Sequence, residues 1–290
     1  MKDKYVIISP VRNEEDYIEK TIKSVISQTI IPLEYVIVND GSTDETTNII
    51  ERYVNEFNWI KSINRPPKEH SPGAGVVHAF YDGFNHVENT DWDFIVKLDG
   101  DLEFEQFYFE KLLNKFAANP KLGLASGTTY EPRNGKLKKD NMPEDHVRGA
   151  AKMYRKKCWE DIGGIQPVLG WDTIDELKSQ VLGWETRSYK DLIIVHYKPI
   201  GFKQTNVIKR EIRAGERQHY LGYLTLFALL RGLFRMLQKP YFIAGVLNIF
   251  GFLRARINKS EQIKELELIK HLKKKQWKRL KFQKKLLNRQ

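Results

Sequence analysis

Short apolar runs alternate with amphipathic stretches through the first third of this chain. Runs rich in β-branched residues predict buried strands over residues 4–10, 35–40, 61–65 and 94–98. The stretches between them place apolar residues on one helical face and predict helices that begin near residues 18, 45 and 76. Strands that alternate with helices at this spacing form βαβ units, so the sequence predicts an α/β fold with a mainly parallel sheet.

The middle of the chain continues this pattern less regularly. A helix is predicted over residues 104–116, and strands are predicted over 122–130 and 191–196. Residues 131–144 are polar and rich in Lys, Asn and Pro, which predicts a loop. This loop is either a mobile segment that closes over a site or a solvated insertion.

The last part of the chain is apolar and basic at once. Residues 220–237 and 241–253 are apolar, but Arg231, Arg235 and the Lys239-Pro240 pair interrupt them, which disfavours a transmembrane helix. They predict two amphipathic helices that lie in a membrane interface or pack on the preceding domain or on a second subunit. Beyond Ser260 a basic amphipathic helix is predicted, suited to an anionic lipid surface or simply solvated.

These patterns predict two regions. Residues 1–215 form one α/β domain, with halves at about 1–101 and 102–215, and residues 216–290 form a helical appendage. The chain of 290 residues has net charge +11 and one cysteine, Cys158, which excludes an internal disulfide framework. From Gly251 onward there are 14 Lys and Arg against 3 Glu, so the preceding body is neutral, with 34 basic and 34 acidic residues. A basic tail suggests an anionic surface, whereas a neutral body disfavours a nucleic-acid-binding protein.

Polar residues follow three of the predicted strands. Asn13 and Glu14 come after the first strand, Asp40 after the second, and Asp99-Gly100-Asp101 after the fourth. In parallel sheets ligands bind at the carboxyl ends of the strands, so these residues are expected on one rim. Two carboxylates one residue apart suit Mg²⁺ or Mn²⁺, and the glycine between them lets the backbone approach a ligand closely.

The same segments resemble the family 2 glycosyltransferases of GT-A fold. The resemblance rests on Pro10-x-Arg12-Asn13-Glu14, on Asn39-Asp40-Gly-Ser-x-Asp44 and on Leu98-Asp-Gly-Asp101, and it covers roughly residues 4–200. It implies transfer of a sugar from a nucleotide-sugar, with a UDP- or GDP-sugar the expected donor, while Mg²⁺ or Mn²⁺ holds the diphosphate. One departure lies in Gly75 to Gly83, where Phe80 and Tyr81 replace an Arg-Asn pair of many relatives, and Arg65 is the candidate replacement charge.

The resemblance also suggests roles for individual residues. Asp101 is expected to bind the metal, Asp99 to meet the metal or the ribose, and His196 to be a third ligand or a structural histidine. Arg12 and Glu14 are expected to contact the nucleotide or to pair with each other, while Ser42 and Asp44 cap the next helix. The residues expected to contact the nucleotide-sugar are Pro10, Arg12, Glu14, Asp40, Arg65, Lys97, Asp99 and Gly100.

A second cluster is expected to serve the acceptor. Alignment of the Gly183-Trp184 turn with the family pattern makes Asp172 the predicted general base, with Asp175 in reserve one turn later. The alternative is that Asp172 caps a helix. Contacts with the diphosphate or the acceptor are expected from Trp171, Arg210 and Arg213.

Together these features predict an inverting, metal-dependent glycosyltransferase that builds a surface polysaccharide or glycolipid. Its acceptor would be a sugar or a lipid-linked saccharide, and its place would be cytoplasmic, peripheral at the inner face of the membrane through the C-terminal helices. No nucleic-acid partner is expected, and a homo-oligomer is left open. The alternatives are a basic-tailed nucleic-acid binder and a nucleotidyltransferase, which would need a Gly-rich phosphate loop where Pro10-Val-Arg-Asn-Glu stands.

Overall fold

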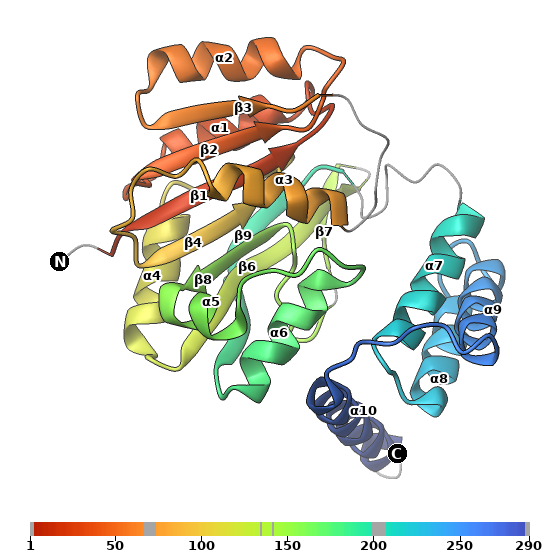
Figure 1. Cartoon of the computed structure of the whole chain (residues 1–290). Coiled ribbons are helices and arrows are strands. Elements are labelled where there is room, and N and C mark those ends of the chain that lie inside the picture. The colour runs from red at the N-terminus through yellow and green to blue at the C-terminus, as the bar shows by residue number, and fades with distance from the viewer. Residues whose placement is uncertain (1–2, 67–73, 134, 141, 199–206, 288–290) are drawn as a thin grey trace. The chain divides into compact units, whose positions relative to one another are not determined.

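The structure is a computed structural model that describes residues 3–66, 74–133, 135–140, 142–198 and 207–287. The chain divides into two compact units, residues 1–199 and 200–290, and each is described by itself (Figure 1). The boundary predicted at residue 215 falls inside helix α7 (Val207–Tyr220). This helix packs on α9 (Ile243–Ile257), so it belongs with the C-terminal helices and the division comes earlier in the chain.

Nine strands of the described residues form one sheet in the first unit. Their order is β3-β2-β1-β4-β8-β6-β9-β5, and β7 pairs with β6. The first four strands are parallel, as the alternation of strands and helices predicts. The bounds are β1 Tyr5–Val11, β2 Glu34–Asn39, β3 Ile60–Asn64, β4 Phe94–Leu98, β5 Leu102–Phe104, β6 Leu122–Arg133, β7 Lys136–Lys139, β8 Ala151–Arg155 and β9 Glu185–His196.

The second half of the sheet is mixed rather than parallel. Strand β8 runs antiparallel to β4 and β6, β5 runs antiparallel to β9, and only β6 and β9 are parallel. A parallel neighbour requires a crossover of a dozen or more residues. Strand β5 starts directly after the Asp99-Gly100-Asp101 turn, so it leaves β4 and joins the far edge of the sheet instead.

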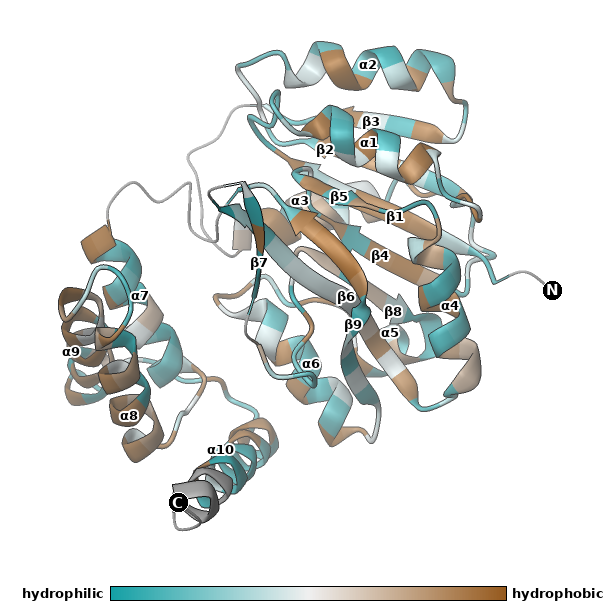
Figure 2. Cartoon of the chain, turned by 180° about the vertical axis from the view of Figure 1, so that it is seen from behind, coloured by the Kyte–Doolittle hydropathy of each residue, from teal (hydrophilic) through white to brown (hydrophobic). Residues whose placement is uncertain are grey.

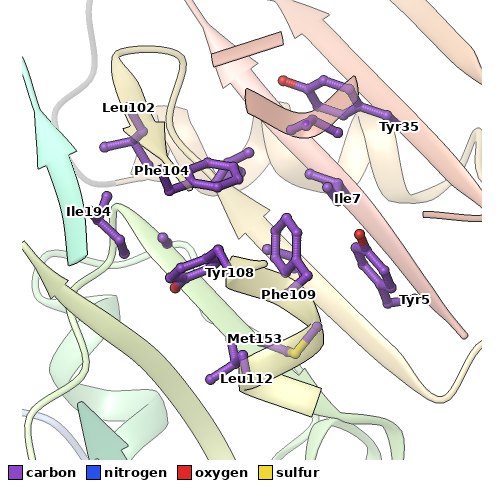
Figure 3. Close-up of a cluster of buried hydrophobic side chains, with 14 of the residues drawn as sticks. Tyr5, Ile7, Tyr35, Leu102, Phe104, Tyr108, Phe109, Leu112, Met153 and Ile194 are labelled. Atoms are coloured by element: carbon purple, nitrogen blue, oxygen red, sulfur yellow. The ribbon is translucent and has the colours of Figure 1, made fainter. Parts of the chain in front are cut away.

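Helices cover both faces of this sheet. Alternate side chains of β1 enter different cores: Tyr5 and Ile7 pack with α1, α2 and α4, whereas Val6 and Ile8 pack with α3, α5 and α6. Figure 3 shows the first core, in which Phe109 and Leu112 of α4 lie against the sheet. The bounds are α1 Ile18–Ile26, α2 Thr46–Glu56, α3 Ala74–Phe84, α4 Tyr108–Ala118, α5 Lys156–Ile162 and α6 Trp171–Val181.

The polar segment 131–144 is only in part the loop that its composition predicts, because residues 131–133 and 136–139 are strands whereas residues 140 and 142–144 are in neither helix nor strand. Strand β6 continues to Arg133, and β7 returns antiparallel beside it, in a register that pairs Glu131 with Lys138. The pairing satisfies backbone groups of this polar segment, and although Glu131 faces a lysine, Arg133 faces Lys136 with the same sign of charge. The prediction failed because the hairpin is exposed and lacks the apolar alternation that identifies a half-buried strand.

The second unit is helical. It contains α7, α8 (Thr225–Met236), α9 and α10 (Leu266–Leu287), and α9 packs on both α7 and α8. Helix α10 meets the turn after α7, where the N–H of Leu224 donates to Gln276 Oε1 at 2.9 Å. Among the described helices, none is both long enough and apolar enough to cross a membrane.

Candidate functional site

The carboxyl ends of three neighbouring parallel strands bring the predicted polar residues to one edge of the sheet. Strand β1 lies between β2 and β4, and all three run in the same direction. Asn13 and Glu14 follow β1, Asp40 follows β2, and Asp99 follows β4. This edge is where open α/β sheets bind their ligands.

A cluster of two carboxylates and one imidazole lies beside this edge. One ligand atom each from Asp99, Asp101 and His196 lies within 4.8 Å of the others. His196 Nε2 is 3.2 Å from Asp101 Oδ2. The pairing of β5 with β9, which sets Leu102 opposite His196, brings the histidine next to the acidic turn from almost a hundred residues away in the chain.

Burial and pairing act against each other on these groups. Burial alone would raise the pKa of Asp101, but the hydrogen bond with His196 and the charges of His196 and Lys198 lower it. Burial alone would lower the pKa of His196, but the hydrogen bond to Asp101 and the negative charge beside it raise it. The two side chains therefore stabilise each other's charged forms.

The three residues fit a divalent cation. Carboxylate oxygens are hard ligands that suit Mg²⁺ and Mn²⁺, and an imidazole nitrogen is accepted by Mn²⁺ and its transition-metal neighbours. Asp101 is held in place by a second contact, because the backbone N–H of Lys198 donates to its Oδ2 at 3.2 Å. Asp101 is buried and Asp99 and His196 are half-buried, so the ligand atoms are shielded without being sealed off.

Lys198 is a site residue that sequence reasoning missed. Its Nζ lies 2.6 Å from Glu14 Oε2 and donates to the carbonyl oxygen of Asn13 at 2.8 Å. Glu14 therefore pairs with a residue two positions after the end of β9, and this contact connects that end of β9 to the loop after β1. The one signal in the sequence was position, since Lys198 stands two residues after His196.

Asp40 has a partner that is distant in sequence. Arg65 Nη1 lies 2.7 Å from Asp40 Oδ1, and Arg65 Nε lies 2.8 Å from Asp82 Oδ2. Arg65 was predicted as a charge near the donor, and the structure places it directly against Asp40, whereas Asp82 was not predicted. The loop after β2 is ordered by Asp44, which accepts the N–H of Thr46 at 3.1 Å, and by Ser42, which accepts the N–H of Asn13 at 3.0 Å. Neither is the N-cap of α2, which is Glu45, so the predicted capping by Ser42 and Asp44 is wrong.

The departure in residues 75–83 has a structural reason. These residues lie in α3, where Phe80 is buried and its ring centroid lies 5.7 Å from that of Trp159. The Tyr81 hydroxyl accepts the N–H of Ile165 at 2.8 Å. Both side chains thus serve the second core rather than a ligand. Pro10 is also in regular structure, since it lies within β1 opposite Val38 and not in a turn, while Arg12 directly follows that strand.

Lys97 and Gly149 connect the acidic turn to helix α6. Lys97, on β4, contacts the carboxylate of Asp99 and donates to the carbonyl oxygen of Gly149 at 2.8 Å. A Cβ added to Gly149 would lie 3.0 Å from the ring of Trp171 and 3.3 Å from Cβ of Asp172. The first turn of α6 therefore lies against the segment that also holds Lys97.

Asp172 and Asp175 have different surroundings. Asp172 lies half-buried in the first turn of α6. The N-cap residue of this helix is Gly170, so the alternative prediction that Asp172 caps the helix is wrong. Asp175 is 1% exposed and accepts hydrogen bonds from Lys152 Nζ at 2.8 Å and from the Tyr154 hydroxyl at 2.5 Å. Burial raises the pKa of Asp175 to about 6. A carboxylate so enclosed suits a structural role better than contact with an acceptor.

Arg210 and Arg213 lie on α7 in the second unit. Arg210 Nη2 is 3.0 Å from Glu211 Oε1, so a carboxylate of its own helix already neutralises it in part. Their contact with a diphosphate stays a prediction.

Comparison with known proteins agrees with this geometry. The family model described as "Glycosyl transferase family 2" matches residues 6–167. Glycosyltransferase GlyA of Streptococcus pneumoniae is 34% identical over 113 residues, which is 39% of this chain and 15% of that protein. Poly-beta-1,6-N-acetyl-D-glucosamine synthase of Staphylococcus aureus is 25% identical over 218 residues, which is 73% of this chain and 44% of the synthase. The chain thus spans less than half the length of these relatives.

Two solved structures share the fold. Mannosyltransferase PcManGT from Pyrobaculum calidifontis, solved with GDP-Man and Mn²⁺, has a TM-score of 0.60 at 15% identity, over 90% of this chain and 89% of that one. TarS 1–349 of S. aureus, solved with UDP-GlcNAc, has a TM-score of 0.54 at 15% identity, over 88% and 73%. The predicted GT-A fold is therefore confirmed. Because the family model spans more than half of the residues, this chain belongs to glycosyl transferase family 2.

Proposed function

We propose that this protein is an inverting, metal-dependent glycosyltransferase that moves a sugar from a nucleotide-sugar to an acceptor hydroxyl. The observation that carries the proposal is the cluster of Asp99, Asp101 and His196 at the carboxyl edge of the parallel strands. Asp99 of this cluster directly follows β4, and Asp40 directly follows β2 on the other side of β1. Membership of family 2 favours sugar transfer over the nucleotidyl transfer considered as its alternative.

The donor's nucleoside would lie at the end of β2. Asp40 is oriented there by Arg65 at 2.7 Å and accepts hydrogen bonds from a base edge or from ribose hydroxyls. Lys97 orients Asp99 toward the same region through its contact with that carboxylate. The expected donors are UDP- and GDP-sugars, because the similar structures were solved with GDP-Man and with UDP-GlcNAc.

Asp101, Asp99 and His196 would hold Mn²⁺ or Mg²⁺. When bound, such an ion supplies positive charge that stabilises the leaving nucleoside diphosphate. The protein's part is to hold the ligands in place: Asp101 is fixed by the N–H of Lys198, and Asp99 by Lys97. Lys198 in turn is fixed by Glu14, so residues on β4 and after β9 hold the metal ligands in position.

Asp172 would act as the general base. Its carboxylate takes the proton of the acceptor hydroxyl while that oxygen forms a bond to the anomeric carbon, and the bond from that carbon to the diphosphate breaks. One displacement of this kind inverts the anomeric configuration. The helix turn that carries Asp172 is anchored, since Lys152 Nζ donates to the Asp172 carbonyl oxygen at 2.5 Å.

The acceptor would be a sugar or a lipid-linked saccharide in the synthesis of a surface polysaccharide or glycolipid. A relative named as a polysaccharide synthase supports this class. A cytoplasmic place at the inner face of the membrane fits such an acceptor, and homo-oligomer formation stays a prediction.

Donor binding is tested by thermal shift with UDP-, GDP-, CDP- and dTDP-sugars, each with and without Mn²⁺. We expect one donor to raise the melting temperature only when Mn²⁺ is present, and Asp101→Asn to abolish that increase. Asp91→Asn is the matched control. Asp91 lies before the start of β4, at the end of the strand away from the site, and its side chain is 80% exposed. If no donor shifts the melting temperature with Mn²⁺, or if Asp101→Asn still responds fully, the proposal is wrong.

The base is tested separately with Asp172→Asn. We expect the Mn²⁺-dependent donor shift to persist while transfer to acceptor falls by about 10²–10⁴-fold, the usual contribution of a general base. Asp191→Asn, at a 60% exposed carboxylate, should leave transfer unchanged. Full transfer by Asp172→Asn would move the role to another residue.

A further inference from the structure

Small residues hold the three helices α7, α8 and α9 together. A Cβ added to Gly215 would lie 2.0 Å from the carbonyl oxygen of Asn248, and one added to Gly251 would lie 2.2 Å from that of Ile212. Between α8 and α9, a Cβ on Gly245 would lie 2.3 Å from the carbonyl oxygen of Gly232. The helices therefore approach each other closely at these glycines, where Ile249 packs against Gly232 and Met236 packs against Gly245.

Most of the large apolar side chains of α8 and α9 are exposed, whereas Phe252 is buried. On α8 they recur every three or four residues at Leu226, Leu230 and Leu233, and on α9 at Ile243, Val246 and Phe250. These six residues define what we call the outer face, and each is between 43% and 58% exposed. Figure 2 shows α8 and α9 largely in the brown of hydrophobic residues.

The opposite side of each helix carries the buried residues. On α8 these are Ala228 and Gly232, and on α9 they include Ala244, Asn248 and Gly251. Helices in water bury their largest apolar residues and expose polar ones. Here most of the buried residues are small, with Phe252 as the large exception, while many Leu, Ile and Phe side chains are exposed. This pattern resembles that of helices that pack through small residues in an apolar surrounding.

The connection between the two helices extends the outer face. Leu237, Tyr241 and Phe242 are 69%, 55% and 69% exposed. Two packed helices and their connection thus expose at least nine large apolar residues, more than the isolated exposed residues of ordinary soluble proteins, which indicates an interaction site.

The charge of this region indicates which kind of partner the outer face binds. Residues 217–260 contain seven Lys and Arg and no Asp or Glu, and among the described residues Arg235 and Arg254 of this set pair with carboxylates, those of Glu211 and Glu216 on α7. Two copies of so basic a surface would repel each other, whereas an anionic lipid surface attracts it. Aromatic side chains with polar edges, such as Tyr241, suit the same headgroup region.

We propose that the outer face of α8 and α9, with the connection between them, inserts into the headgroup region of a membrane rich in anionic phospholipid. The helices lie in the interface plane and do not cross the bilayer. The basic residues contact lipid phosphates while the apolar residues enter the acyl boundary. The proposal does not depend on the sugar-transfer chemistry of the first unit.

Vesicle flotation of the full chain tests it. The probes are vesicles of phosphatidylcholine and vesicles of an equimolar mixture of phosphatidylcholine and phosphatidylglycerol. We expect binding to the anionic vesicles, weaker binding at high salt, and at least tenfold weaker binding by Leu233→Glu/Phe242→Glu. The matched control is Ile31→Glu/Leu182→Glu, which places two charges at exposed apolar residues of the first unit and should bind as the unmodified protein does.

A conservative variant guards against misfolding of the doubly charged one. Phe234→Trp, at a 64% exposed position, should show a blue-shifted emission with anionic vesicles and quenching by brominated lipid. No flotation with either vesicle, or an unchanged tryptophan spectrum, would overturn the proposal. So would sedimentation of the protein as a dimer that Leu233→Glu/Phe242→Glu dissociates, because the outer face would then be a surface for self-association.

Discussion

At the scale of single residues, Lys152 connects strand β8 to the helix that carries the proposed base. Its side chain is completely buried, and its Nζ donates both to the Asp175 carboxylate at 2.8 Å and to the Asp172 carbonyl oxygen at 2.5 Å. The same Nζ lies 5.5 Å from the centre of the Trp171 ring, and Lys97 Nζ lies 5.6 Å from it. The ring of Trp171 therefore lies close to both Lys97 of β4 and Lys152 of β8.

Removal of the Lys152 charge should destabilise the protein strongly. Lys152→Met leaves the buried carboxylate of Asp175 without its cation, which typically costs about 3–5 kcal/mol in the free energy of unfolding. Urea denaturation measures the loss. Lys157→Met, at a 67% exposed lysine of the following helix, should cost little. Addition of Asp175→Asn to Lys152→Met should recover part of the loss, and a further loss would contradict this account.

The pH dependence of stability should report Asp175. Burial raises the pKa of its carboxyl from the usual 3.8 to about 6. The folded protein therefore binds a proton there at a pH where the unfolded chain has released it, so the stabilisation is complete below pH 3.8 and is lost as the pH rises through 6. We expect the free energy of unfolding, measured relative to Asp175→Asn, to fall over this range.

The exposed carboxylate of Asp191 serves as the control for this pH dependence of stability. The hydrogen bond from Lys115 lowers the pKa of Asp191, so its small contribution is lost as the pH falls. Relative to Asp191→Asn, the stability of the unmodified protein should not fall as the pH rises. An equal slope for both variants would show that the effect does not come from burial of Asp175.

At the scale of elements, the close contact of α7 with α9 depends on glycine. In an open helix Gly→Ala usually stabilises by about 1 kcal/mol through helix propensity. At Gly215 the added Cβ would lie 2.0 Å from the Asn248 carbonyl oxygen and 2.6 Å from the Phe252 nitrogen. These are backbone atoms, so the two helices must separate to admit the methyl group.

Gly215→Ala should therefore lower stability despite its better helix propensity. We expect a net loss of about 1–3 kcal/mol, the usual cost of overpacking, in the part of the thermal transition that reports the second unit. Circular dichroism follows it. Arg213→Ala, an exposed change on the same helix, should leave this transition in place. A gain in stability for Gly215→Ala would show that α7 and α9 lie farther apart.

At the scale of the whole molecule, charge is divided between the two units. Residues 1–199 carry 26 Lys and Arg against 32 Asp and Glu, whereas residues 200–290 carry 22 against 5. The unit with the acidic cluster is thus net negative, and the unit with the outer face is strongly positive. This division is consistent with one unit that binds a cation and its ligand and another that binds an anionic surface.

The two activities should be separable by substitution. We expect Leu233→Glu/Phe242→Glu to lose vesicle binding and keep the Mn²⁺-dependent donor shift. Asp101→Asn should show the reverse, with vesicle flotation unchanged and the donor shift lost. Flotation and thermal shift on the same preparations check both. Loss of both properties in either variant would mean that the units depend on each other for folding.

The sequence alone determined the features that depend on neighbours along the chain. Its alternation of apolar and polar positions predicted strands β1 to β4 and the helices between them, and so placed Asp40 and Asp99 at one edge of a parallel sheet. Its interrupted apolar and basic runs predicted the C-terminal helices. Motif resemblance identified the family, which the comparisons confirm.

Only the tertiary structure decided which side chains meet. The pairing of β5 with β9 puts His196 against Asp101, and the same edge brings Lys198 to Glu14. Burial beside Lys152 distinguishes Asp175 from Asp172, although both stand on one helix. The spacing of apolar residues shows which face of each helix or strand is buried. The pairing and register of strands that are distant in sequence depend instead on long-range packing, which no local pattern of residues encodes.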